Sequence, residues 1–189
     1  MYPLLLCSVI TLAIIIDRTL FWVRHRNGRR PELIAELCSY AKKGEQTAPD
    51  GINPDLIARV LLEGLVCTRE EATWRMEQAG AREAGKVTRY LGVLNTMVSL
   101  APLLGIFGTV LGIIESFQLL GDASLIDPVA ASGGLAQALI TTAFGLGIAM
   151  PSLIACKVFE AKSIQLRCEL ETRCTELELS LGLKPFTGA

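Results

Sequence analysis

The chain has 189 residues, enough for one or two soluble domains, but 51% of them are hydrophobic and only 6% are aromatic. The formal net charge of −1 hides a separation, because all 18 lysines and arginines and the single histidine lie outside residues 91–156. An interval of that length without a basic residue is typical of membrane spans and argues against a soluble globular protein.

The first apolar run, residues 1–23, is expected to form a transmembrane helix of ~30 Å at ~1.5 Å per residue. Near its end we expect Arg18 to reach the membrane surface, and Phe21 and Trp22 to form an interfacial aromatic anchor. A secretory signal peptide is the alternative. It is disfavoured because no basic region precedes the run and no small-residue cleavage pattern follows it.

Residues 24–90 are expected to form a cytoplasmic helical region. Residues 31–43 and 55–65 predict two short helices, separated by a loop rich in Gly, Pro, Thr and Asp. Thr68 and Glu71 then have the spacing of a capping box, which predicts the start of a long helix. Because no Gly-Pro break follows, we expect this helix to continue without interruption into the second membrane span.

Residues 91–120 and 131–156 are the second and third predicted spans, joined by a short periplasmic loop at residues 121–130. The third span is expected to continue as a cytoplasmic C-terminal helix over residues 157–189, where charges recur at helical spacing. Strand signals are absent. The predicted fold is an all-α integral membrane protein with three transmembrane helices, two of them extended into the cytoplasm as long helices.

Basic residues follow the first and third apolar runs, whereas the loop between the second and third runs has carboxylates only. The positive-inside rule therefore predicts a periplasmic N-terminus and a cytoplasmic C-terminus. Between residues 91 and 156 the carboxylates are Glu115, Asp122 and Asp127, all near the outer edge.

No nucleophile–base pair, phosphate loop or metal motif is visible, and the six cysteines show no C-x-x-C spacing. His25 lies among arginines at a membrane flank and is interpreted as part of a positive anchor. We therefore expect no enzymatic activity, no cofactor, no metal and no nucleic-acid partner.

Small residues recur at helical spacing in the second and third spans: Gly105, Gly108 and Gly112, and Gly145 with Ala149. They let helix backbones approach closely. One interpretation is packing within one subunit. The other, which we favour, is packing that leaves a polar seam where subunits meet, because polar side chains lie among these residues.

Those polar side chains are Thr109, Gln137, Thr141 and Thr142. Polar groups inside an apolar span cost free energy, so they usually line a path or an interface. We expect them to line a proton path.

At these residues the chain resembles the proton-channel family of ExbB, TolQ and, more distantly, MotA. APLLGIFGTVLGIIESF and GGLAQALITTAFGLGIAMPSLIACKVFE resemble the family's second-span and third-span signatures, and AIIIDRTLFWVRHR is similar to the end of its first span. Three spans favour ExbB or TolQ, because MotA has an additional span.

The resemblance implies a pentameric ring in the lipids of the bacterial inner membrane, around the one-span helices of an ExbD or TolR partner that each bear an Asp. Proton flow at that Asp drives force, which passes to TonB or TolA. Thr109 and Thr142 match the family's pore-facing threonines. Gln137 falls where many members have Glu and cannot change charge, so the titrating group would reside on the partner.

The favoured function is an ExbB-like subunit of a motor that energises TonB-type transport across the outer membrane. A TolQ-type subunit for envelope maintenance and a non-conducting structural scaffold are the alternatives.

Overall fold

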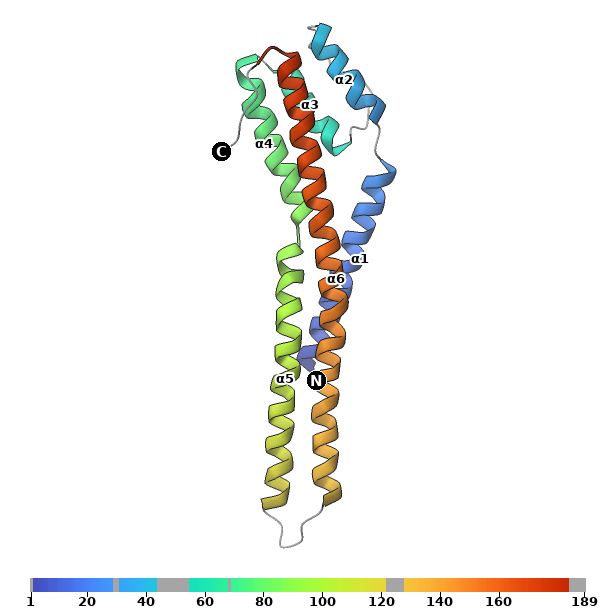
Figure 1. The fold of residues 1–189 in the computed structure, drawn as a ribbon, viewed down its shortest axis with the longest axis vertical. Coiled ribbons are helices and arrows are strands. Elements are labelled where there is room, and N and C mark those ends of the chain that lie inside the picture. The colour runs from blue at the N-terminus through green and yellow to red at the C-terminus, as the bar shows by residue number, and fades with distance from the viewer. Residues whose placement is uncertain (1, 29–30, 44–54, 68, 122–127, 184–189) are drawn as a thin grey trace. The chain divides into compact units, whose positions relative to one another are not determined.

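The computed structural model describes the chain except for residues 1, 29–30, 44–54, 68, 122–127 and 184–189. The described part consists of helices joined by short connections and contains no strand. The helices are α1 (Tyr2–Asn27), α2 (Pro31–Lys43), α3 (Leu56–Leu65), α4 (Arg69–Thr88), α5 (Leu91–Gly121) and α6 (Pro128–Ser180), drawn in Figure 1. The predicted all-α fold is confirmed.

The chain divides into two compact units. Met1–Thr19 and Tyr90–Phe159 make up the first, here called the membrane unit. Leu20–Arg89 and Glu160–Ala189 make up the second, here called the polar unit. Helices α1 and α6 each contribute one end to each unit.

Within the described residues, three helical stretches are long and apolar enough to cross a membrane: Tyr2–Asn27, Glu71–Gln118 and Ser132–Ser180. A helix satisfies its backbone hydrogen bonds internally, which the hydrocarbon requires because it offers no water. The three predicted spans therefore lie within helical stretches, and the second and third stretches extend beyond the predicted spans, to residues 71 and 180.

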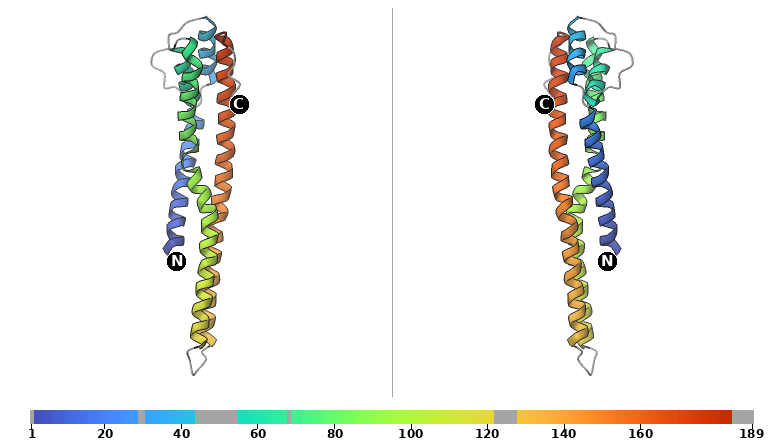
Figure 2. Two further views of the ribbon diagram at one scale, coloured as in Figure 1. Left: turned by 90° about the vertical axis from the view of Figure 1, so that its left-hand side faces the viewer. Right: turned by 90° about the vertical axis from the view of Figure 1, so that its right-hand side faces the viewer.

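In the membrane unit, α5 and the first part of α6 lie side by side in Figure 1 and overlap in both views of Figure 2. Buried residues on α6 recur every three or four positions, the spacing of one helix face. They are Ala138, Thr141, Gly145, Ala149, Ser152, Cys156 and Phe159. On α1 the corresponding buried residues are Leu4, Cys7, Thr11, Ile14 and Arg18.

In the polar unit, α3 packs against α4 and α2 packs against α3. Helix α3 is the centre of this unit, since Ile57, Val60 and Leu61 have 0% exposure. The side chain of Asp55 caps α3 by accepting the Leu56 N–H over 2.7 Å, which satisfies a donor that the first helical turn leaves free.

The predicted continuous helix between the capping box and the second span is wrong. Helix α4 ends at Thr88 and α5 begins at Leu91. Between them Tyr90 has a φ of 65°, a left-handed conformation that an α-helix does not contain. Thr68 of the predicted capping box lies outside the described residues, as do the predicted loop after α2 and most of the predicted periplasmic loop.

Candidate functional site

Two threonine hydroxyls meet between α5 and α6 in the membrane unit. Thr109 Oγ1 lies 2.9 Å from Thr142 Oγ1, 33 residues away in the chain. The Thr142 hydroxyl also donates to the Gly105 carbonyl over 3.0 Å. The Thr109 hydroxyl lies 2.7 Å from the Ile106 carbonyl and 3.2 Å from the Gly105 carbonyl. Each hydroxyl has one proton and two lone pairs, and the two hydroxyls have more acceptors within reach than protons to donate. Either hydroxyl can therefore donate to a different acceptor and still accept a hydrogen bond from another group.

The hydroxyl pair depends on a close approach of the two backbones. A Cβ at Gly145 would lie 2.6 Å from the carbonyl oxygen of Ala101, and a Cβ at Gly105 would lie 3.1 Å from the Cα of Thr142. Backbone atoms cannot move aside as the end of a flexible side chain can. Glycine at both positions therefore lets the Thr142 hydroxyl reach a carbonyl of the other helix.

The close contact continues toward the end of α5. A Cβ at Gly108 would lie 2.8 Å from Thr141 Oγ1, and one at Gly112 would lie 2.7 Å from the Cβ of Ala138. Ala149, four residues after Gly145, is buried on the same face of α6. The structure therefore places the glycines in packing within one chain.

The four predicted polar residues do not form a single line. Thr109 and Thr142 are half-buried and meet each other. Thr141 is buried, faces α5 and donates to the Ala138 carbonyl of its own helix over 2.6 Å. Gln137 is exposed. The arrangement separates a hydroxyl pair between the helices from an amide on the surface of the chain.

Among the described residues between positions 91 and 156 there is one carboxylate, Glu115, on the exposed surface of α5. It follows Thr109 by six residues, or about 9 Å along a helix axis. Asp122 and Asp127 lie outside the described residues. Within the described spans, the threonine pair can hold and orient a polar group but has no acid beside it that could take up a proton.

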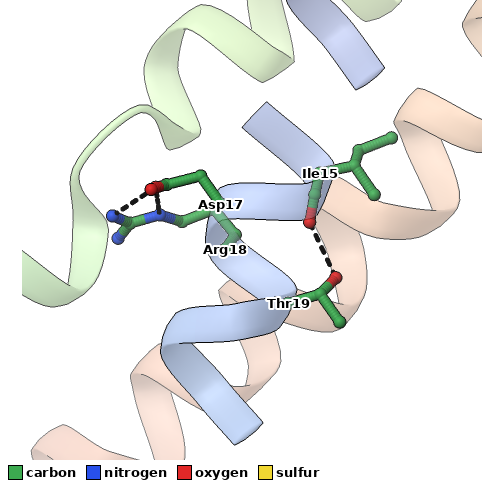
Figure 3. Close-up of polar contacts among 4 residues, drawn as sticks. All are labelled: Ile15, Asp17, Arg18 and Thr19. Atoms are coloured by element: carbon green, nitrogen blue, oxygen red, sulfur yellow. Dashed lines mark hydrogen bonds and ion pairs between the residues drawn. The ribbon is translucent and has the colours of Figure 1, made fainter. Parts of the chain in front are cut away.

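A charged pair lies on α1 in the membrane unit, shown in Figure 3. Nε and Nη2 of Arg18 lie 3.1 and 2.9 Å from Oδ2 of Asp17. The Arg18 guanidinium also lies 5.5 Å from the ring centroid of Tyr90. The side chain of Arg18 is 6% exposed while that of Asp17 is 55% exposed, so Arg18 packs inside the membrane unit. Its place at the membrane surface stays a prediction. Sequence reasoning missed this contact because Arg18 and Tyr90 are distant in the chain.

Phe21 and Trp22, the predicted aromatic anchor, contact each other with ring centroids 5.9 Å apart. Trp22 is 9% exposed and packs edge-on against His25, with ring centroids 5.8 Å apart. The Lys162 ammonium lies 5.7 Å from the centroid of the Trp22 ring. His25 faces Asp55 and is not part of an exposed positive anchor. Trp22 and His25 therefore belong to the interior of the polar unit.

The helices and the site define a multi-pass, all-α membrane protein whose described spans carry paired hydroxyls and little charge. The chain belongs to the MotA/TolQ/ExbB proton channel family, whose model matches residues 52–172. That match includes all of α5, which supplies Thr109, and the part of α6 that supplies Thr142.

This chain is similar to proteins named ExbB-like and to a protein named TolQ. An ExbB-like biopolymer transport protein of Synechocystis sp. is 29% identical over 185 residues, which cover 94% of this chain and 88% of the relative. A second ExbB-like protein of Synechocystis sp. is 32% identical over 189 residues, which cover 95% and 74%. The Tol-Pal system protein TolQ of Pseudomonas aeruginosa is 34% identical over 138 residues, which cover 73% and 55%.

Proposed function

We propose that this chain is the channel-forming subunit of an ExbB-like, proton-driven motor complex in a bacterial inner membrane. The observation that carries the proposal is the contact between the hydroxyls of Thr109 and Thr142, 2.9 Å apart within spans that lack basic residues. Membership in a proton channel family supports a role for that contact in proton transfer. We propose that the chain has no enzymatic activity of its own.

The threonine pair would serve a carboxyl group supplied by another protein. A hydroxyl donates to a carboxylate and accepts from a carboxylic acid, so the pair can hold both protonation states. Gln137 can form hydrogen bonds but cannot change charge. The titrating Asp would therefore lie on the one-span helix of an ExbD-like or TolR-like partner.

Several copies of the chain would surround the partner. The resemblance of the sequence to its family implies five copies. Large apolar side chains on α5, among them Leu103 and Phe107, are 61% and 59% exposed in the single chain. So much exposed apolar surface is unfavourable in water, and lipids and neighbouring subunits would cover it. The basic flanks support a periplasmic N-terminus and a cytoplasmic C-terminus.

The complex would pass force to a TonB-like protein and so energise transport across the outer membrane. A TolA-like recipient and an envelope-maintenance role form the alternative, supported by the similarity to TolQ. A non-conducting scaffold is the third possibility. It differs from both in a measurable way, because it would move no protons.

The test is proton uptake by liposomes that contain the chain together with its one-span partner. Thr109→Val and Thr142→Val keep the side-chain shape and remove the hydroxyl. Each should slow proton flux by roughly tenfold, the effect of losing a hydrogen bond to a charged group, while the complex still assembles. Thr96→Val is the matched control, because Thr96 is exposed and its hydroxyl donates to the Gly92 carbonyl of its own helix.

Wild-type flux in the Thr109→Val/Thr142→Val double variant would show that the path does not use this pair. Absence of flux in the wild-type complex under a proton gradient would favour the scaffold.

A further inference from the structure

Two polar side chains of the membrane unit do not belong to the threonine pair: Glu115 on α5 and Gln137 on α6. Both are exposed, and neither forms a hydrogen bond or ion pair with another described residue. Glu115 lies in a helical stretch that is apolar enough to cross a membrane, where a carboxylate is costly unless another group pairs with it. Some group must therefore stabilise Glu115.

Glu115 and Gln137 lie on the same side of the contact between α5 and α6. The residues that face the other helix are Gly105, Gly108, Gly112 and Ser116 on α5, and Gly134, Ala138, Thr141 and Gly145 on α6. One residue turns a helix by ~100°. Thr109 and Thr142 each come one residue after a member of these lines, and they meet on one side of the contact. Glu115 and Gln137 each come one residue before a member, so they lie together on the opposite side.

The two side chains are also close along the helix axes. A Cβ at Gly112 would lie 2.7 Å from the Cβ of Ala138, which places these two residues at the same level of the antiparallel helices. Toward the end of α5, Glu115 is three residues beyond Gly112 and Gln137 is one residue beyond Ala138. The axial offset of two residues corresponds to about 3 Å. Side chains tilt toward the N-terminus of their own helix, so these two tilt toward each other.

This chain supplies no cation at that depth. The Lys, Arg and His residues of the membrane unit are limited to Arg18 and Lys157. Lys157 follows Gln137 by 20 residues, which is about 30 Å along α6, and Arg18 lies beside Tyr90 at the other end of α5. A second copy in the same orientation has the same sequence and adds no cation at this level. A cationic partner for Glu115 must therefore come from another kind of molecule.

Apolar side chains continue the same side of the helix pair toward the middle of the span. Leu111 lies about one turn before Glu115, and Phe144 lies two turns after Gln137. Both are exposed. Because the helices are antiparallel, both steps lead away from the end of α5. The surface therefore has a polar end and an apolar strip, the same order as the headgroup and acyl chain of a phospholipid.

We propose that Glu115, Gln137 and the apolar strip of Leu111 and Phe144 bind a phospholipid whose headgroup has a primary ammonium, such as phosphatidylethanolamine. The Glu115 carboxylate accepts charge-assisted hydrogen bonds from the ammonium, and these are stronger than neutral ones. The side-chain amide of Gln137 donates to a phosphate oxygen. A basic segment of another protein would pair with Glu115 but would leave the apolar strip without a purpose. The site does not depend on proton conduction.

The experiment is a lipid titration of the full-length chain, purified from membranes in detergent micelles and followed by native mass spectrometry. Three phospholipids with the same acyl chains are compared. Phosphatidylethanolamine has a primary ammonium, phosphatidylcholine has a cation without an N–H, and phosphatidylglycerol has no cation. We expect phosphatidylethanolamine to bind roughly tenfold more tightly than the other two, the effect of a hydrogen bond to a charged group.

Two variants at position 115 should change this preference in different ways. Glu115→Gln keeps the size of the side chain and removes the charge, so the preference should disappear. Glu115→Lys should reverse it in favour of phosphatidylglycerol. Asp17→Asn is the matched control, because it removes an exposed carboxylate of the same unit that Arg18 already pairs with, and it should leave the preference unchanged. The mass of the intact protein in the same spectra shows whether each variant assembles.

Equal binding of the three lipids by the wild-type chain would overturn the proposal. So would an unchanged preference in Glu115→Gln. A protein that co-purifies with the wild-type chain and is lost from Glu115→Gln, with no change in lipid preference, would assign the site to a basic protein segment instead. Because no proton flux is measured, failure here is distinguishable from failure of the proposed channel function.

Discussion

The hydroxyl of Thr142 on α6 donates to the carbonyl of Gly105 on α5 over 3.0 Å. A hydrogen bond between membrane helices meets no competition from water and contributes about 1 kcal/mol. This one forms only because a glycine at position 105 lets the two backbones approach. The place of the candidate hydroxyl pair in the membrane unit is therefore fixed by glycine packing.

Gly145→Ala should weaken the α5–α6 contact more than the same substitution at a glycine whose added Cβ would meet no atom within 4 Å. The new Cβ would lie 2.6 Å from the carbonyl of Ala101, so the helices must separate. We expect a loss of ~1–3 kcal/mol in stability, the usual cost of overpacking, measured by unfolding in mixed micelles. Gly147→Ala is the control, because no atom lies within 4 Å of its added Cβ. Equal stability of the two variants would contradict the packing.

Tyr90 should respond to substitution in two separable ways. Tyr90→Ala removes the ring beside Arg18 and leaves a side chain at a φ of 65°. Tyr90→Gly also removes the ring but relieves the left-handed strain, so it should be more stable than Tyr90→Ala by about 1 kcal/mol. Chemical unfolding of both variants measures this difference. If Tyr90→Ala is the more stable of the two, the chain is helical at this position.

Cys174 should be unreactive although it is only half-buried. Burial, followed by the carboxylates of Glu178 and Glu171, raises the pKa of its thiol from 9.0 to about 12. Since the thiolate is the reactive form, a maleimide at pH ~8 should label exposed Cys168 and spare Cys174. Mass spectrometry of digested, labelled protein distinguishes the two sites.

The same shift predicts a pH dependence of stability. The folded state keeps the Cys174 thiol protonated to a higher pH than the unfolded state does. Its contribution to the free energy of unfolding is therefore fully present below pH 9.0 and is lost as the pH rises toward about 12. Cys174→Ser should reduce the loss of stability in that range. An unchanged profile in this variant would show that another group causes the alkaline decline.

The orientation predicts which cysteines an impermeant reagent reaches. Gln118 is exposed near the end of α5 that we place outside, and Cys168 is exposed on the part of α6 that we place inside. In intact spheroplasts, a maleimide should label Gln118→Cys and spare Cys168, and permeabilisation should expose both. Labelling of Cys168 alone before permeabilisation would invert the topology.

The sequence by itself determined the class of fold, the spans and the family resemblance. Charges are too costly in hydrocarbon to be scattered through it, so the absence of basic residues over residues 91–156 marks the membrane segments. Backbone groups in hydrocarbon must pair locally, so those segments are helices. Small residues at helical spacing likewise predicted close packing before any partner helix was known.

Only the tertiary structure decided which side chains meet. Thr109 and Thr142 are 33 residues apart, and their contact depends on how closely α5 and α6 approach. The burial of Arg18 and the pairing of His25 with Asp55 likewise involve distant segments. The left-handed turn falls on Tyr90 and not on the nearby Gly92, and the Tyr90 ring lies beside the Arg18 guanidinium of another helix. Periodicity and charge describe one helix at a time, whereas these contacts arise from packing between helices.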